Sequence, residues 1–74
     1  MVKEIGNRIT ADPNVMGGKP VIKGRRVAVE FIIQRIAGGM NIAEVADQYD
    51  LRPEDIKSAL EYAAHLVSLR RARE

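Results

Sequence analysis

Four cations lie within eight residues of one another in the first half of the chain, and their chemistry suits a polyanion. This basic cluster consists of Lys19, Lys23, Arg25 and Arg26. No acidic residue interrupts it between Asp12 and Glu30. Such side chains neutralise nucleic-acid phosphates and release bound counterions, so the basic cluster predicts phosphate contact. The alternative is a solvated strand edge that its charges keep from pairing with other strands.

Catalytic groups are scarce in this sequence. The only histidine, His65, is expected to be a solvated side chain on the far side of its helix from the core. Glu54 and Asp55 are adjacent, so on a helix they point about 100° apart and suit the positive end of the helix dipole better than acid–base work. Gly17-Gly18-Lys19 lacks the spacing of a phosphate loop, because Pro13 stands where that loop needs glycine. We therefore predict no enzymatic activity, no catalytic residues, no metal, no cofactor and no small-molecule substrate.

The composition is that of a small globular chain. Its 74 residues are 46% hydrophobic and 30% charged, with no cysteine and a net charge of +2. The absence of thiols fits a reducing compartment, and no apolar run could cross a bilayer, so we expect a cytoplasmic single domain over residues 1–74 with no membrane partner. A chain this short has a thin stability margin, which favours association.

Hydrophobic spacing predicts three helices after a short β element. Two β-prone pieces at residues 20–22 and 26–28 flank Lys23-Gly24, which indicates a hairpin within about residues 9–28, and a weaker alternation marks a candidate strand at residues 8–11. Apolar residues then recur at helical spacing, so helices are expected at about 29–38, 41–49 and 53–70. Asn41 with Glu44 forms a capping-box pattern, and Pro53 suits a first helical turn.

The last two of these helices have the spacing of a helix-turn-helix, because a short helix and a turn of about four residues precede a longer helix. The fold class is therefore predicted as mostly α, a three-helix helix-turn-helix domain with a short N-terminal β-hairpin. Residues near the start of the third helix would meet bases, and the candidates are Arg52, Lys57 and Ser58. The neighbouring Glu54 and Asp55 would repel phosphate, so a scaffold or dimer role for this unit stays open.

Two apolar features exceed what an isolated core needs. Phe31 lies roughly opposite the core face of helix 29–38, and Tyr62, Leu66 and Leu69 form a second stripe on the last helix, beside an expected core face that includes Val67. Packing under the N-terminal segment or the hairpin is the alternative. We favour protein interfaces, for self-association or for a partner, because so small a chain gains from association.

Residues 17–29, GGKPVIKGRRVAV, resemble the glycine-glycine-lysine-proline-valine-isoleucine signature of domain-of-unknown-function family 433. The resemblance continues through Ile32-Ile33, Gly39-Met40 and residues 53–56, and covers about residues 10–64. It implies a small prokaryotic helix-turn-helix domain, homodimeric and similar to a VapB-type antitoxin. Such an antitoxin binds a PIN-like ribonuclease toxin and represses its own operon by binding DNA.

If toxin binding occurs, we expect it to use the helix-three stripe (Tyr62, Leu66 and Leu69) together with Arg70, Arg71 and Arg73. The chain departs from the usual pattern at Arg25 and Arg52, where threonine is common, and at Asp50, where proline is common. Losing threonine at position 52 removes a good cap for the third helix. The leading hypothesis is thus an antitoxin-like DNA-binding regulator. The alternative is a protein-interaction or dimerisation module that does not bind DNA.

Overall fold

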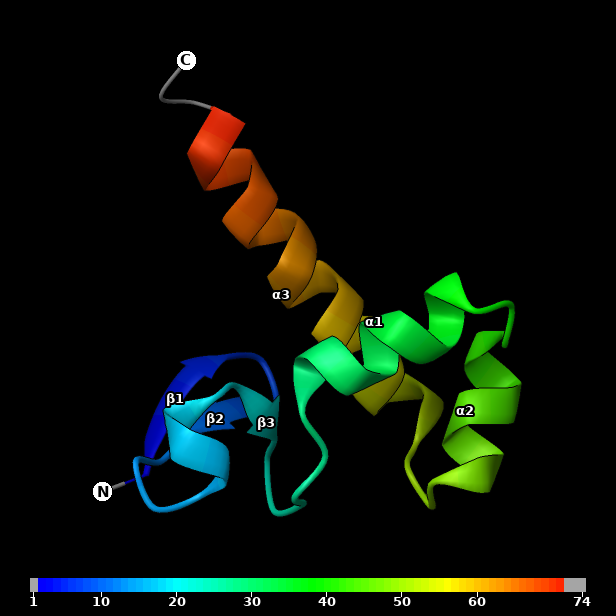
Figure 1. Ribbon diagram of the computed structural model, residues 1–74, viewed down its shortest axis with the longest axis horizontal. Coiled ribbons are helices and arrows are strands. Elements are labelled where there is room, and N and C mark those ends of the chain that lie inside the picture. The colour runs from blue at the N-terminus through cyan, green and yellow to red at the C-terminus, as the bar shows by residue number, and fades with distance from the viewer. Residues whose placement is uncertain (1, 72–74) are drawn as a thin grey trace.

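Residues 3–11 form two strands that join a third to make an antiparallel sheet, and three helices follow it (Figure 1). The structure is a computed structural model that describes residues 2–71, with side chains described through Leu69. The elements are β1 (Lys3–Gly6), β2 (Ile9–Ala11), the 3-10 turn η1 (Met16–Gly18), β3 (Val21–Ile22), α1 (Val29–Ala37), α2 (Ile42–Gln48) and α3 (Pro53–Arg71). This is a small α+β domain, so the prediction of a mostly α fold with a short hairpin was wrong.

The sheet differs from the expected hairpin because the main partner of β3 is β2, and the residues that follow β3 pair with it only briefly. Ile9 lies opposite Ile22 in the register, and both side chains are buried. After β3 the chain turns tightly, with the amide of Arg25 donating to the carbonyl of Ile22. Only one isolated bridge joins Val21 to Ala28, because Ala28 is already the N-cap of α1. The expected second strand at residues 26–28 is therefore reduced to this bridge, with the amide of Ile22 donating to the carbonyl of Val27.

The turn between β1 and β2 has an unusual backbone. Arg8 adopts a φ of 64°, a left-handed conformation that a side chain with a Cβ disfavours. Strain of this kind persists where other contacts hold the residue in place. The guanidinium of Arg8 supplies such a contact, because it reaches a carboxylate on α3 that is described below.

The core lies where the three helices meet β2 and β3. Its largest fully buried side chains are Ile9, Ile22, Ile32, Val45 and Ile56. The sheet also packs closely on α3: a Cβ added at Gly6 would stand 3.0 Å from Cδ1 of Tyr62. Glycine at this position lets the β1–β2 turn approach the helix.

Helix α2 has a complete capping box, as the sequence predicts. The amide of Glu44 donates to Oδ1 of Asn41 at 2.8 Å, and the amide of Asn41 donates to Oε1 of Glu44 at 2.9 Å. Asp50 follows the C-cap Tyr49 of this helix and has a φ of 55°, which allows the amide of Leu51 to donate to the carbonyl of Ala46. Proline could not adopt this φ, so a chain with the proline that the resemblance leads us to expect at position 50 would need a different turn into α3.

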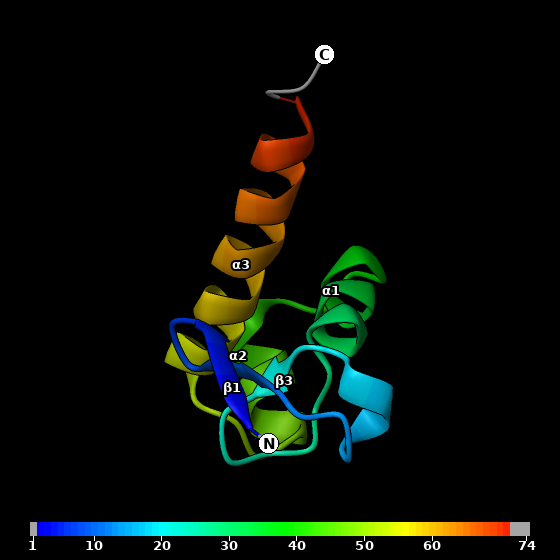
Figure 2. The same cartoon turned by 90° about the vertical axis from the view of Figure 1, so that its left-hand side faces the viewer.

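Helix α3 begins in the core and then projects beyond the rest of the domain (Figures 1 and 2). All described side chains from Ala64 to Leu69 are exposed. Val67, expected on the core face, is 58% exposed because no other described element reaches this far along the helix. Within residues 2–71, no helix is long and apolar enough to cross a membrane.

Candidate functional site

The basic cluster is continuous in sequence but divided in space. Three of its members form ion pairs with acids from three different elements. Lys19 pairs with Glu30 of α1 at 2.5 Å, Lys23 pairs with Glu4 of β1 at 3.4 Å, and Arg25 pairs with Asp50 at 3.4 Å. Lys23, Arg25 and Arg26 line one hollow, whereas Lys19 lines another, between α1 and α3.

Arg25 and Arg26 are the members that lie near the connection between α2 and α3. Asp50, the partner of Arg25, belongs to this connection and is 95% exposed. Arg26 is exposed and makes no side-chain hydrogen bond or ion pair with the part of the chain that the structure describes. Arg52 lies two residues after Asp50 and is also exposed. The ion pair of Arg25 thus joins the basic loop after β3 to the connection before α3, and we call Arg25, Arg26 and Arg52 the basic turn.

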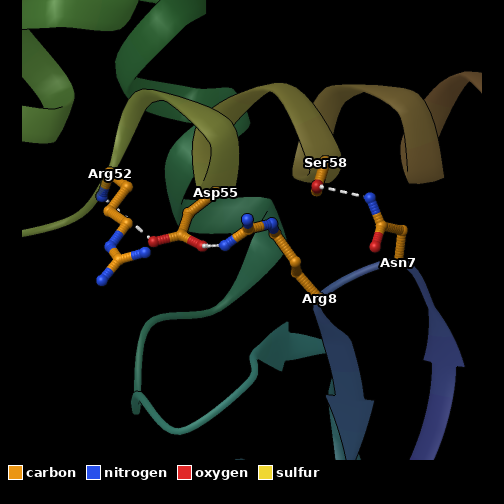
Figure 3. Close-up of polar contacts among 5 residues, drawn as sticks. All are labelled: Asn7, Arg8, Arg52, Asp55 and Ser58. Carbon is orange, nitrogen blue, oxygen red and sulfur yellow. Dashed lines mark hydrogen bonds and ion pairs between the residues drawn. The ribbon is translucent and has the colours of Figure 1, made fainter.

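The start of α3 is held by a polar network from the β1–β2 turn (Figure 3). Nη1 of Arg8 pairs with Oδ1 of Asp55 at 3.3 Å, and Oδ2 of the same carboxylate accepts the amide of Arg52 at 3.0 Å. One turn further, Nδ2 of Asn7 donates to the hydroxyl of Ser58 at 3.4 Å. These contacts join residues about fifty positions apart and fix the angle at which α3 leaves the sheet.

This network changes what the acids at the start of α3 offer to a ligand. Asp55 is only 8% exposed, and its charge is shared between Arg8 and the backbone amide of Arg52, the residue before the helix. Glu54 is exposed and remains the acid that a phosphate would meet there. Of the sequence candidates for base contact, Lys57 is exposed, whereas Ser58 is 5% exposed and faces Asn7.

Phe31, a predicted interface residue, packs within the chain. Its ring is half-buried and stands edge-on to Tyr49 with centroids 5.0 Å apart. The guanidinium of Arg35 lies 5.0 Å from the centre of the Phe31 ring, in the range of a cation–π contact. Packing between α1 and the end of α2 thus explains why Phe31 is apolar although it lies outside the main core face.

An apolar groove of about 200 Å³ separates α1 from the second half of α3. Its walls are formed by Val29 and Ile33 of α1 and by Tyr62, Ala63 and Leu66 of α3. Tyr62 is half-buried, Leu66 is 44% exposed, and Leu69, one turn beyond, is 53% exposed. The predicted helix-three stripe therefore borders an open groove. Of the other predicted interface residues, Arg73 and the side chains of Arg70 and Arg71 lie outside the part that the structure describes.

Several residues that organise these surfaces were not singled out from the sequence. Arg8 pairs with an acid 47 positions away, and no local pattern signals so distant a contact. Ile33 looked like an ordinary core residue of α1, yet it is half-buried and lines the groove. Among the residues with described side chains, no group of three metal-ligating side chains lies close enough to hold a metal ion.

The family model described as "Protein of unknown function (DUF433)" matches residues 9–63, which are 55 of the 74 residues. The chain belongs to the DUF433 family. No curated protein and no solved structure matches it significantly. The DUF433 match includes the basic turn and the N-terminal part of the groove, and it ends before Leu66 and Leu69.

Proposed function

We propose that this DUF433 domain is an antitoxin-like regulator that binds DNA through the basic turn. The observation that carries the proposal is the contact of Arg25 with Asp50, because it holds the basic loop beside the connection from α2 to α3. A short helix, a four-residue connection and a longer helix are the parts of a helix-turn-helix, in which the start of the second helix meets the major groove. Arg25, Arg26 and Arg52 would contact phosphates, and Lys57 is the candidate for a base edge.

The ion pair of Arg25 leaves this residue available to DNA. Its side chain is 47% exposed and that of Asp50 is 95% exposed. Exposed pairs of this kind contribute only about 0–1 kcal/mol, so a phosphate can replace the carboxylate at little cost. Burial of Asp55 supports the same proposal, because its compensated charge no longer opposes a phosphate at the start of α3.

Binding of a PIN-like ribonuclease toxin and repression of the chain's own operon form the second part of the proposal. They rest on the resemblance to VapB-type antitoxins. The exposed apolar side chains of α3 support a protein partner in general, since a small domain rarely leaves several large apolar residues of one helix in water without use.

A protein-interaction module without DNA binding is the second candidate. Glu54 and Glu61 are both exposed on α3, and they flank Lys57. Their charges oppose phosphate along the face that would enter a groove. This candidate predicts a protein complex with no affinity for the operon's DNA.

Charge reversal at matched positions separates the two candidates. The experiment is a titration of the wild-type chain against its own upstream promoter fragment and a scrambled fragment, at 50 and 200 mM salt. The regulator predicts preference for the promoter and affinity that falls steeply with salt. R25E/R26E should lower the affinity by about 100-fold or more and flatten the salt dependence.

The control is K3E/K19E, which changes the net charge by the same amount at two exposed cations outside the hollow that Arg25 and Arg26 line. It should lower the affinity by less than about tenfold, since only long-range attraction is lost. Equal losses in the two variants would refute the basic turn as the contact. No binding by the wild-type chain at 50 mM salt would refute the regulator and favour the interaction module.

The toxin half of the proposal has a separate test. The product of the adjacent gene is co-expressed with this chain and its ribonuclease activity is measured with and without the chain. Stable co-purification together with loss of that activity is the expected result. An active neighbouring ribonuclease that does not co-purify would contradict the antitoxin assignment.

A further inference from the structure

A hollow lies on the face of the sheet that is turned away from the core. Thr10 of β2 and Val21 of β3 are partners in the register, so their side chains share one face. The adjacent partners, Ile9 and Ile22, belong to the core on the other face. A face turned away from the core commonly meets water in an antiparallel sheet. Thr10 is nevertheless only 6% exposed and Val21 only 3%, and as the most deeply buried lining residues they form the floor of the hollow.

The hollow has a volume of about 260 Å³ and two kinds of wall. Val2 and Val15 add apolar surface beside the floor. The loop after β3 supplies a cationic rim, which consists of Lys23, Arg25 and Arg26. Pockets for drug-sized ligands usually measure about 300–1,000 Å³ and combine an apolar lining with a few polar groups. The hollow therefore suits a somewhat smaller ligand with an apolar part and an anionic part.

The hydroxyl of Thr10 is a buried polar group that the chain leaves without a partner. It makes no hydrogen bond with any residue of the part that the structure describes. Buried hydroxyls usually have a partner, so an unused one calls for an explanation. Among the described residues, only Nε of Arg35 is both unpartnered and fully sealed from solvent, so the Thr10 hydroxyl can be reached from the hollow. A ligand in the hollow would supply the missing hydrogen bond.

The charges around the hollow favour an anion. Lys23 and Arg25 form exposed ion pairs at 3.4 Å with acids of β1 and of the α2–α3 connection, and such pairs are easily exchanged. Arg26 makes no ion pair within the described part of the chain. Asp12 is the only acid among the described lining residues, and its Oδ1 already accepts the amide of Asn14 at 2.9 Å. Three cations thus face one partly compensated carboxylate.

We propose that this hollow binds the phosphate group of a small phosphomonoester that has an apolar body. A phosphate monoester carries close to two negative charges at pH 7 and three strong acceptor oxygens. The planar guanidinium of Arg26 matches two of these oxygens, and the Thr10 hydroxyl donates to the third from the floor. The apolar body of the ligand lies against Val2, Val15 and Val21.

The position of Thr10 separates this ligand from a phosphate of duplex DNA. A backbone phosphate is a diester with one negative charge, and the chain continues from it on both sides. It can meet exposed cations at the rim, but it cannot bring a free oxygen down to a residue that is 94% buried in a small hollow, whereas a terminal phosphate can. The site is therefore distinct from the phosphate contact of the basic turn, although the two share Arg25 and Arg26.

This sharing has a regulatory consequence that rests on the proposed function. A phosphomonoester in the hollow occupies Arg25 and Arg26 and so competes with DNA for the basic turn. A competitor at ten times its dissociation constant should lower the apparent DNA affinity by about tenfold. Binding of the phosphomonoester itself does not depend on DNA binding.

A nuclear magnetic resonance titration of the full ¹⁵N-labelled chain tests the site, with phenyl phosphate as the probe at pH 7.5 and constant ionic strength. We expect a dissociation constant of about 1 mM or below, which a ligand of this size can reach. The amides of Thr10, Val21 and Gly24 should show the largest shifts. Methyl phenyl phosphate is the matched diester and should bind at least about tenfold more weakly, because it lacks one charge and one free oxygen.

Two substitutions test the assigned contacts. Thr10→Val keeps the shape of the side chain and removes the hydroxyl, so phenyl phosphate affinity should fall by about tenfold. The midpoint of thermal unfolding should not fall, because the hydroxyl has no partner in the chain. Arg26→Gln should also weaken binding by about tenfold, whereas Lys3→Gln, which removes an exposed cation outside the hollow, should change it less than about twofold.

Several outcomes would overturn the site. These are no binding of phenyl phosphate at about 10 mM, shifts centred elsewhere, unchanged affinity in Thr10→Val, and equal losses in Arg26→Gln and Lys3→Gln, which would mean adventitious attraction only. Diester binding as tight as that of the monoester would assign the hollow to DNA-type phosphates.

Promoter titrations with and without phenyl phosphate test the competition. Phenyl phosphate should weaken DNA binding of the wild-type chain, and it should have a smaller effect on Thr10→Val, which should itself bind DNA normally. If phenyl phosphate fills the hollow while DNA affinity stays unchanged, the competition is refuted. A chain that binds phenyl phosphate but not DNA would refute only the proposed function, whereas a chain that binds DNA but not phenyl phosphate would refute only the hollow as a site.

Discussion

The two halves of α3 relate to the rest of the chain in opposite ways. In the first half, Asp55, Ile56, Ser58 and Ala59 are all buried, and the β1–β2 turn contributes polar contacts to two of them. In the described part of the second half, every side chain from Ala64 to Leu69 is exposed, although leucine and valine are among them. One continuous helix thus changes from a core element to a projecting one within about two turns.

The contrast teaches that sequence hydrophobicity and burial are separate properties along this helix. The first half is stabilised within the chain, so its exposed cations, Arg52 and Lys57, are free to serve a ligand. Short helical segments in water are marginal, and most helical stability in proteins comes from packing of an apolar face. The second half has such a face but no cover within the described residues, which is why an association suits it.

Truncation of one apolar side chain in each half gives the largest expected contrast. Ile56→Ala should lower the free energy of unfolding by about 3–4 kcal/mol, because it removes buried methyl groups and leaves a cavity. Val67→Ala should change it by less than about 0.5 kcal/mol, since this side chain already contacts water. Urea unfolding of both variants at the same low micromolar concentration measures the difference. Similar losses would mean that the second half is buried in the isolated chain after all.

Loss of the carboxylate that fixes the start of α3 should have an intermediate effect. Asp55→Ala removes the hydrogen bond to the amide of Arg52, the residue before the helix, worth about 1 kcal/mol, and leaves Arg8 without its partner. Because the Arg8 side chain is 40% exposed and can be rehydrated, we expect a total loss of about 2 kcal/mol and not the 3–5 kcal/mol of a fully buried pair.

Glu54→Ala is the control for this substitution, because it removes an adjacent but exposed acid from the same turn. Its effect in thermal unfolding should be below about 0.5 kcal/mol. If the two variants lost equal stability, the contribution of Asp55 would be a general effect of charge near the helix start and not the specific pair with Arg8.

Local patterns predicted the helices well. The recurrence of Val29, Ile32, Ile33 and Ile36 located α1, and the Asn41–Glu44 capping box that starts α2 is confirmed by both of its hydrogen bonds. Such signals depend on residues within one or two turns, so the sequence contains them in full. The weaker alternation at residues 8–11 likewise corresponds to β2.

Contacts between distant segments could not be predicted in the same way. β3 is two residues long, and its partner is chosen by burial of Ile22 against Ile9, which no alternation in so short a strand reveals. The basic cluster was divided by acids that lie 11 to 25 positions away along the chain. The contact of Phe31 with Tyr49 spans the break between α1 and α2, so the spacing of apolar residues within α1 could not show it.

The smallest expected effect concerns the cap at the start of α3 and sharpens the comparison with α2. At α2 the capping box is complete, whereas α3 has only the carboxylate half, from Asp55 to the amide of Arg52. Arg52→Thr would supply the missing hydroxyl and should raise the free energy of unfolding by about 0.5–1 kcal/mol. The same change removes a cation from the basic turn, so DNA affinity should fall by about tenfold.

Arg52→Ala separates these two consequences, because it removes the same charge without adding a cap. It should lose DNA affinity equally while gaining no stability, as judged by urea unfolding and promoter titration of both variants. If Arg52→Thr gained stability while its DNA affinity stayed unchanged, Arg52 would not contact DNA. DNA binding would then not explain why the cap of α3 is incomplete. Opposite shifts of stability and affinity in Arg52→Thr would show that the start of α3 gives up cap stability for a positive charge facing DNA.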